Sequence, residues 1–232
     1  MAGGAPNSPM SGDGVFNGDY SVLGQLNFNL NDDVALGFTY VHGFHKSTSP
    51  IYGAGARDGN GLVGTPMANL SSSSLNSYFS DQMGMPVTVE MRDKISNSYG
   101  AEFAWRLSDR INMSAFFNYT NVTRIGRGND DVWTYGGGFA FPDLFKEGNV
   151  LGIFAGVQPY NGNSSYFLNV GGTSQKTRIS ASNELPIHIE GFYKYQLNDN
   201  ISLTPGIIWI NSPNQGNENS QLIGTLRSTF TF

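Results

Sequence analysis

The chain of 232 residues contains no cysteine, which excludes disulfide bonds and thiolate metal sites. Basic residues are few: 13 Lys and Arg stand against 18 Asp and Glu, and the formal net charge is −5. No basic stripe or cluster is present that would neutralise phosphates, which argues against nucleic-acid binding. Charged residues make up only 13% of the chain, which is an unusual composition for a cytosolic enzyme.

Long apolar runs are also absent, because none approaches the roughly 18 residues that a membrane-spanning helix needs. Residues 1–10 have neither basic residues nor an apolar core, so they do not resemble a signal peptide. The lack of cysteine nevertheless suits an exported protein. The sequence therefore predicts either a chain that is not exported or one whose true start lies before residue 1.

Alternating stretches joined by short polar turns are what the sequence has in abundance. They are LNFNLNDDVALGFTYV (26–41), AEFAWRLSDRINMSAFFNYT (101–120) and GFYKYQLNDNISLTPGIIWI (191–210). Each places an Asn/Ser-Asp turn between two runs that alternate apolar with polar or small residues. Since Asn and Asp side chains bond their own backbone and tolerate left-handed conformations, this pattern predicts a repeated β-hairpin.

A fourth hairpin is predicted through PDLFKEG, and a last strand ends the chain. The nine predicted strands are residues 20–30, 33–43, 95–107, 110–120, 132–141, 149–158, 186–197, 200–210 and 221–232. Each is about ten residues long, which exceeds the usual strand of soluble sheets and matches a tilted strand that crosses a membrane. The predicted fold class is all-β, an antiparallel transmembrane β-barrel.

Residue parity divides each strand into an apolar and a polar face. Trp105, Ile189 and Tyr195, for example, lie on apolar faces, and aromatic residues gather at strand ends as in the girdles of outer-membrane barrels. The charged residues on the polar faces are Glu102, Arg106, Glu190, Lys194 and Arg227. We expect them to line a wet interior and to influence which ions pass. The alternative is that cross-strand ion pairs merely hold the wall.

Short turns alternate with long connections along the chain. The predicted long loops are residues 44–94, 121–131, 159–185 and 211–220, and SSSS (71–74) is expected to be a flexible loop segment. Outer-membrane barrels have short periplasmic turns and long external loops, so residues 1–19 and 44–94 are predicted to be extracellular. A loop of some fifty residues suits a pore constriction or a surface loop.

The stretch from YQLNDNISLTPGIIWI to NSPNQGNENSQLIGTLRSTFTF resembles the C-terminal part of cyanobacterial outer-membrane porins related to the OprB carbohydrate-selective porins, often labelled iron uptake porins. The resemblance implies a barrel of about sixteen strands, of which this chain would be the C-terminal portion. It implies passive diffusion of sugars, inorganic ions or iron, without catalysis or a cofactor. The implied partners are membrane lipid, the solutes, a second and third copy in a homotrimer, and the barrel-assembly machinery, which would read Phe230 and Phe232.

Three single motifs allow more specific interpretations. His42 and His45 lack a third metal ligand nearby, which favours structural or rim roles and predicts no metal site. The glycines of GGGF (136–139) are more typical of a crowded barrel wall than of a phosphate loop. Glu102 and Glu190 would form an acid/base pair for glycoside cleavage only if the fold brought them together.

Two other classes of protein remain open from the sequence. An outer-membrane enzyme of lipase type would need a nucleophile and a base, yet His188 is the one histidine on a predicted strand whose face points to the interior, and no G-x-S-x-G occurs. A soluble β-sandwich binding module would also alternate, with its apolar side inward.

Overall fold

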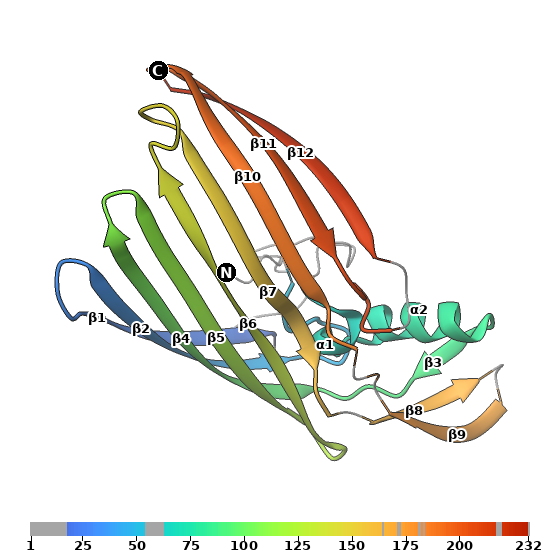
Figure 1. Cartoon of the computed structure of the whole chain (residues 1–232). Helices are drawn as coiled ribbons and strands as arrows, with labels where there is room; N and C mark the ends of the chain where they lie inside the picture. Colours follow the sequence, from blue (N-terminus) through green and yellow to red (C-terminus); the bar gives the residue numbers. More distant parts are fainter. Residues whose placement is uncertain are drawn as a thin grey trace.

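The computed structural model shows one large antiparallel sheet with a small insert of helices and strands at one end (Figure 1). It describes residues 18–53, 63–163, 165–170, 173–180, 182, 184–216 and 220–231. The large sheet consists, in spatial order, of β1 (Tyr20–Asn29), β2 (Val34–His45), β4 (Lys94–Ser108), β5 (Ile111–Arg124), β6 (Gly128–Pro142), β7 (Val150–Asn161), β10 (Ile187–Asn198), β11 (Ile201–Ile210) and β12 (Gln221–Phe230). The insert contains α1 (Pro66–Asn69), α2 (Ser72–Met83), β3 (Val87–Val89), β8 (Ser165–Val170) and β9 (Thr173–Ser180).

All nine predicted strands are present, and each pairs antiparallel with its neighbour in the sheet. The polar turns act as the sequence predicts. The Asn31 side chain accepts hydrogen bonds from the backbone N–H groups of Asp33 and Val34 at 2.9 and 2.8 Å, and Asn198 accepts one from Asn200 at 3.0 Å. These side chains supply acceptors that the reversing backbone lacks, which fixes the register of the hairpins. We call the end of the sheet that carries these turns the turn end.

The prediction of a long loop over residues 121–131 is wrong. Strands β5 and β6 continue to Arg124 and from Gly128, and a turn of residues 125–127 joins them. Gly126 and Gly128 have φ of 74° and 103°, which glycine adopts without the strain of a side chain. The alternation of Val122 and Arg124 with their neighbours was the signal that the strand continues.

The prediction that residues 71–74 form a flexible loop is also wrong. Ser71 caps α2, because its hydroxyl accepts a hydrogen bond from the Ser74 backbone N–H at 3.2 Å. The predicted loops 44–94 and 159–185 are not structureless, since they supply the helices and the sheet β3-β8-β9 of the insert. Strand β3 pairs with β8 although more than seventy residues separate them, and sequence periodicity does not report such pairing.

The insert packs on one face of the large sheet, which we call the inner face. Val122 of β5 and Val132 of β6 are fully buried in the same cluster as Leu75, Phe79 and Tyr166 of the insert. Val122 and Val132 lie on the faces of β5 and β6 that carry the even-numbered residues. By register, the inner face of β4 and β10 also carries even numbers, whereas that of β2 and β12 carries odd numbers.

The opposite, outer face is apolar and uncovered within the described residues. Large exposed side chains on it include Leu26, Phe38, Tyr99, Trp105, Phe117, Tyr135, Phe139, Ile153, Ile189, Tyr195, Ile207, Leu222 and Leu226. A soluble sandwich would bury this face against a second sheet. A continuous exposed apolar face of this extent instead indicates contact with lipid.

Aromatic residues form a row across the outer face toward the insert end. Tyr40, Tyr99, Tyr119 and Trp133 are cross-strand neighbours, with ring centroids 5.3, 6.4 and 4.4 Å apart in turn. Six residues further along β4, Trp105 lies near the turn end, which at 3.3–3.4 Å per residue is roughly 20 Å away. This spacing is close to the height of the apolar band of an outer-membrane barrel.

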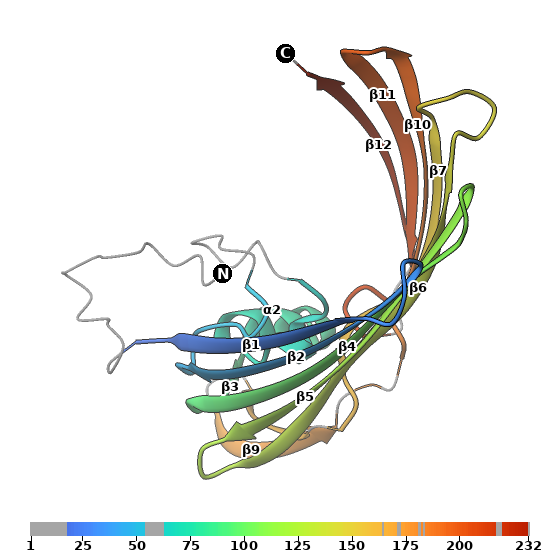
Figure 2. The same ribbon diagram turned by 90° about the vertical axis from the view of Figure 1, so that its left-hand side faces the viewer.

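The sheet is curved and twisted but open within the described residues (Figure 2). β1 pairs with β2 alone and β12 with β11 alone, and every residue of both edge strands is exposed. The described part of the chain therefore shows a barrel wall without showing its closure. Phe232 and residues 1–17 lie outside the described residues, so the predictions that fall on them are not tested by this structure.

Candidate solute pathway

The inner face beyond the insert is polar, and all five charged residues selected from the sequence lie on it. Glu102 and Arg106 come from β4, Glu190 and Lys194 from β10, and Arg227 from β12. Their placement follows from period-two alternation, which directs residues two apart to the same side of a sheet. The structure shows where these side chains lie; their effect on ions remains a prediction.

Arg106 lies at the turn end and is paired. Its Nε donates to Oδ1 of Asp33 at 2.8 Å, and both side chains are about half exposed. A second guanidinium nitrogen donates to the backbone carbonyl of Asp32 at 3.3 Å. An exposed pair of this kind is worth at most about 1 kcal/mol, so it orients the β1–β2 turn more than it stabilises the fold.

The fold brings Lys194 and Arg227 together. Both line one hollow of about 290 Å³, together with Gln196, Ser202 and Thr229. Among the described residues neither forms an ion pair, so two positive charges share a polar recess at the turn end of β10–β12. We expect two such charges to raise the local concentration of anions.

Glu102 and Glu190 are not brought together. Four strand spacings separate β4 from β10 in the sheet, which at about 4.8 Å each amounts to on the order of 19 Å along the sheet. The two carboxylates of a glycosidase stand about 5–9.5 Å apart. Glu190 instead lies beside His188, whose Nε2 is 3.4 Å from its Oε2.

His42 and His45 point to opposite faces of β2, as their odd spacing requires. His42 Nδ1 is 3.0 Å from Oδ1 of Asn97 on the outer face, and His45 Nε2 is 3.0 Å from Oγ of Ser96 on the inner face. The described residues contain no group of three or more His, Cys, Asp or Glu side chains placed to hold a metal ion.

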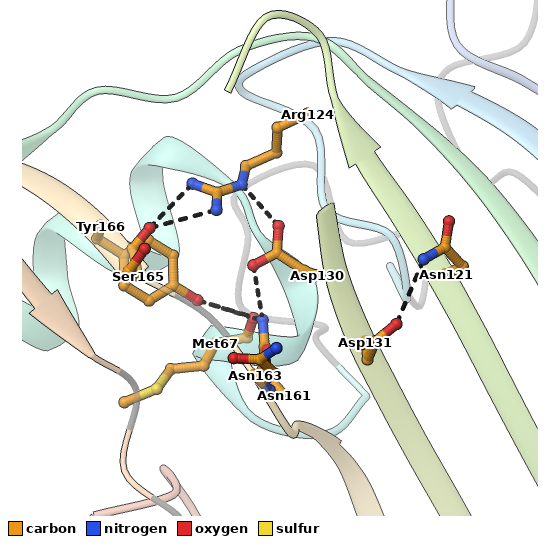
Figure 3. A network of polar contacts seen from close by, with 9 residues as sticks. All are labelled: Met67, Asn121, Arg124, Asp130, Asp131, Asn161, Asn163, Ser165 and Tyr166. Atoms are coloured by element: carbon orange, nitrogen blue, oxygen red, sulfur yellow. Dashed lines mark hydrogen bonds and ion pairs between the residues drawn. The ribbon is translucent and has the colours of Figure 1, made fainter. Parts of the chain in front are cut away.

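A buried polar network attaches the insert to the wall, and the sequence did not predict it (Figure 3). Arg124 of β5 donates through Nε to Oδ2 of Asp130 in β6 at 2.6 Å, with side-chain exposures of 5% and 0%. The same guanidinium donates to the backbone carbonyl of Ser165 in β8 at 3.2 and 3.3 Å. It also lies over the ring of Tyr166, 5.6 Å from its centroid. One arginine thus binds two wall strands and the insert.

Asn161, the last residue of β7, extends this network. Its Nδ2 donates to Oδ1 of Asp130 and to the carbonyl of Met67 in α1, each at 3.3 Å. The fully buried Gln215, from the β11–β12 connection, accepts from the Asn161 backbone N–H at 2.9 Å and from Oγ1 of Thr65 at 3.2 Å. Buried networks whose members are satisfied rigidify the parts that they join.

The insert also contacts the wall through hydroxyl groups. Tyr52 donates to Oγ1 of Thr120 at 2.6 Å, and Thr120 lies 2.7 Å from Oγ of Ser98 on β4. Burial raises the pKa of Tyr52 to about 12, so its hydroxyl keeps its proton at neutral pH. This contact is therefore insensitive to pH over the physiological range.

No helix in the described ranges is long and apolar enough to cross a membrane. The chain matches the family model of carbohydrate-selective porins of the OprB family over residues 2–232. The chain belongs to the OprB family. The resemblance noted in the sequence is thereby confirmed, and with it the assignment to a family of channels of the outer membrane.

Two cyanobacterial relatives match nearly the whole of this OprB-family chain. An uncharacterized protein of Nostoc sp. is 44% identical over 229 residues, which cover 97% of the chain and 34% of the relative. An uncharacterized protein of Synechocystis sp. is 30% identical over 230 residues, which cover 98% of the chain and 39% of the relative. The chain therefore spans between a third and two fifths of the length of these curated relatives.

Proposed function

We propose that the chain forms part of the wall and the constriction of a water-filled channel through which small hydrophilic solutes, sugars first among them, diffuse across the outer membrane. The observation that supports this most strongly is the division of one curved sheet into an apolar outer face and a polar inner face. Lipid would cover the first and water the second. The insert, held on the inner face by the Arg124 network, would narrow the passage.

The same proposal covers the rest of the protein. β1 and β12 would pair with further strands of the same polypeptide, because an unpaired strand edge is costly in lipid. Residues 1–232 would then be the C-terminal portion of a larger barrel, with residues 1–19 and 44–94 on the extracellular side. Phe230 and Phe232 would serve in barrel assembly, and a homotrimer would be the working form. Inorganic ions and iron are further candidate solutes.

We expect the charges on the inner face to set the preference between anions and cations. Replacing Lys194 with glutamine removes a positive charge from the hollow that it shares with Arg227, so the zero-current potential under a salt gradient should shift toward cation preference. The double variant Lys194→Gln/Arg227→Gln should shift it further. The measurement is the reversal potential of the full-length protein, reconstituted in a planar lipid bilayer.

Lys146→Gln is the matched control for this experiment. Lys146 belongs to the β6–β7 turn, and its ammonium lies 5.2 Å from the ring centroid of Tyr195, a residue of the outer face. The control changes the net charge by the same amount outside the proposed passage and should leave the potential unchanged. Equal shifts from Lys194→Gln and Lys146→Gln, or none from the double variant with conductance intact, would reject a selectivity role for these residues.

A further inference from the structure

Two phenylalanine side chains lie on the polar inner face, each over a glycine of the neighbouring strand. A methyl group at Gly136 would stand 2.7 Å from Cζ of Phe154, and one at Gly152 would overlap with Cε1 of Phe192. The absence of side chains at these positions lets each ring rest on the wall. Phe116, from β5, extends the group, because its ring is stacked on Phe154 with centroids 6.2 Å apart.

Phe154 and Phe192 border a recess at the turn end of the inner face. The recess has a volume of about 860 Å³, within the range typical of small-molecule sites. Small inner-face residues form its floor: Ala35, Ala104, Ser114, Gly138, Ala140 and Gly152. Phe154 and Phe192 lie at one side, and the Arg106–Asp33 pair lies at the other.

The recess has two kinds of lining that suit one class of ligand. Aromatic rings carry negative charge on their faces and therefore attract the C–H groups on the flat side of a sugar ring. Asn112 and Ser114 offer amide and hydroxyl groups on the inner face, and Asp33 and Arg106 offer an acceptor and donors. The guanidinium of Arg106 already has a carboxylate partner, so among the described lining residues no unpaired positive charge favours an anion.

We infer that this recess is a binding subsite for a neutral sugar ring, which stacks on Phe154 and Phe192 and hydrogen-bonds to the polar groups opposite. Phe192 lines this recess and also the hollow that holds Lys194 and Arg227. A sugar on the rings would therefore lie beside the ions' route and obstruct the ionic current. This subsite rests on the proposed channel function, which its test also examines.

The test measures the block of ion current by maltotriose in a planar bilayer that contains the reconstituted full-length protein. Phe192→Leu and Phe154→Leu keep apolar cover over the glycines but remove the aromatic face. Each should raise the half-blocking concentration about two- to tenfold, the range expected for loss of one aromatic contact. Phe192→Tyr keeps the ring and should restore the block to its original strength.

Phe117→Leu is the matched control, since Phe117 is the neighbour of Phe116 on β5 but lies exposed on the outer face. It should leave the half-blocking concentration unchanged, and the open-channel conductance of each variant reports whether its wall is intact. If conductance and sugar flux into liposomes are normal while maltotriose blocks the leucine variants at the same concentration as the unmodified protein, the subsite is wrong and the proposed channel stands. If neither ions nor sugars pass, the proposed channel fails, and the subsite fails with it.

Discussion

Replacing Asp130 with asparagine should destabilise the protein strongly, by about 3–5 kcal/mol in the free energy of unfolding. The substitution keeps the shape of the side chain but leaves the guanidinium of Arg124 buried without its counter-charge, because that side chain is only 5% exposed. Arg124→Met should lower the free energy of unfolding by a similar amount, since it leaves the buried carboxylate of Asp130 without its counter-charge. The measurement is urea unfolding in lipid vesicles, followed by tryptophan fluorescence.

The exposed pair Arg106–Asp33 supplies a matched control. It has the same kind of contact, Nε to Oδ1 at 2.8 Å, but both side chains are about half exposed. Asp33→Asn should therefore lower the free energy of unfolding by no more than about 1 kcal/mol. The double variant Arg124→Met/Asp130→Leu should lose less stability than either single variant, because no buried charge remains unpaired. Equal costs for Asp130→Asn and Asp33→Asn would show that the buried pair does not anchor the insert.

The same substitution should also affect conduction. The Arg124 guanidinium joins β5 and β6 to the Ser165 carbonyl of the insert. Asp130→Asn removes the carboxylate that holds this guanidinium, so it weakens the attachment of the insert at that point. Asp130→Asn should raise the single-channel conductance or its fluctuation, because an insert that moves from the inner face widens the passage. An unchanged, quiet conductance would place the constriction elsewhere.

Gly138→Ala should lower the free energy of unfolding by about 1–3 kcal/mol, because the added methyl group overpacks the wall. A methyl group at Gly138 would stand 2.5 Å from the backbone carbonyl oxygen of Ile153 and 3.2 Å from Cα of Phe154. Since both are backbone atoms of the paired strand β7, the strands themselves must separate to accept it. Close approach of β7 thus explains Gly136 and Gly138, and close approach of β5 explains Gly137, which agrees with the crowded wall that the sequence suggested for GGGF.

Gly224→Ala is the control for this prediction. Gly224 lies on the outer face of β12, and a methyl group there has nothing within 4 Å. The substitution should change the free energy of unfolding by no more than about 0.5 kcal/mol. Both variants can be compared by urea unfolding in the same vesicles. If Gly138→Ala proves as mild as Gly224→Ala, crowding by β7 is not the reason for glycine at this position.

The strands and their faces were predictable because they depend on local rules. Period-two alternation identified all nine wall strands, and Asn31 and Asn198 marked turns whose hydrogen bonds the structure shows. The same alternation continues through Val122 and Arg124, so the sequence also contained the signal for the longer strand β5, which the wrongly predicted loop over residues 121–131 missed. Parity likewise places Phe154 and Phe192 on the polar face, so their position was also predictable from the sequence.

The insert and its network were not predictable in this way. Gln215 meets Asn161 across more than fifty residues of sequence, and Asn161 meets Met67 across more than ninety. Such contacts depend on how three separate connections fold together, whereas periodicity reports only a residue's own strand. Helix α2 begins in a serine-rich stretch that resembles a loop, and Ser71 acts as its cap only once Ser74 is helical.

The most direct test of the central claim, that the inner face borders water and the outer face borders lipid, uses the absence of cysteine from this chain. Glu190→Cys and Ile189→Cys place single thiols on neighbouring residues of β10 that point to opposite faces. A water-soluble, membrane-impermeant cationic thiol reagent should change the current through the Glu190→Cys channel in discrete steps and leave the Ile189→Cys channel unaffected. A change of current in the Ile189→Cys channel alone, or equal reactivity of both thiols, would contradict the assignment of the inner face to the passage.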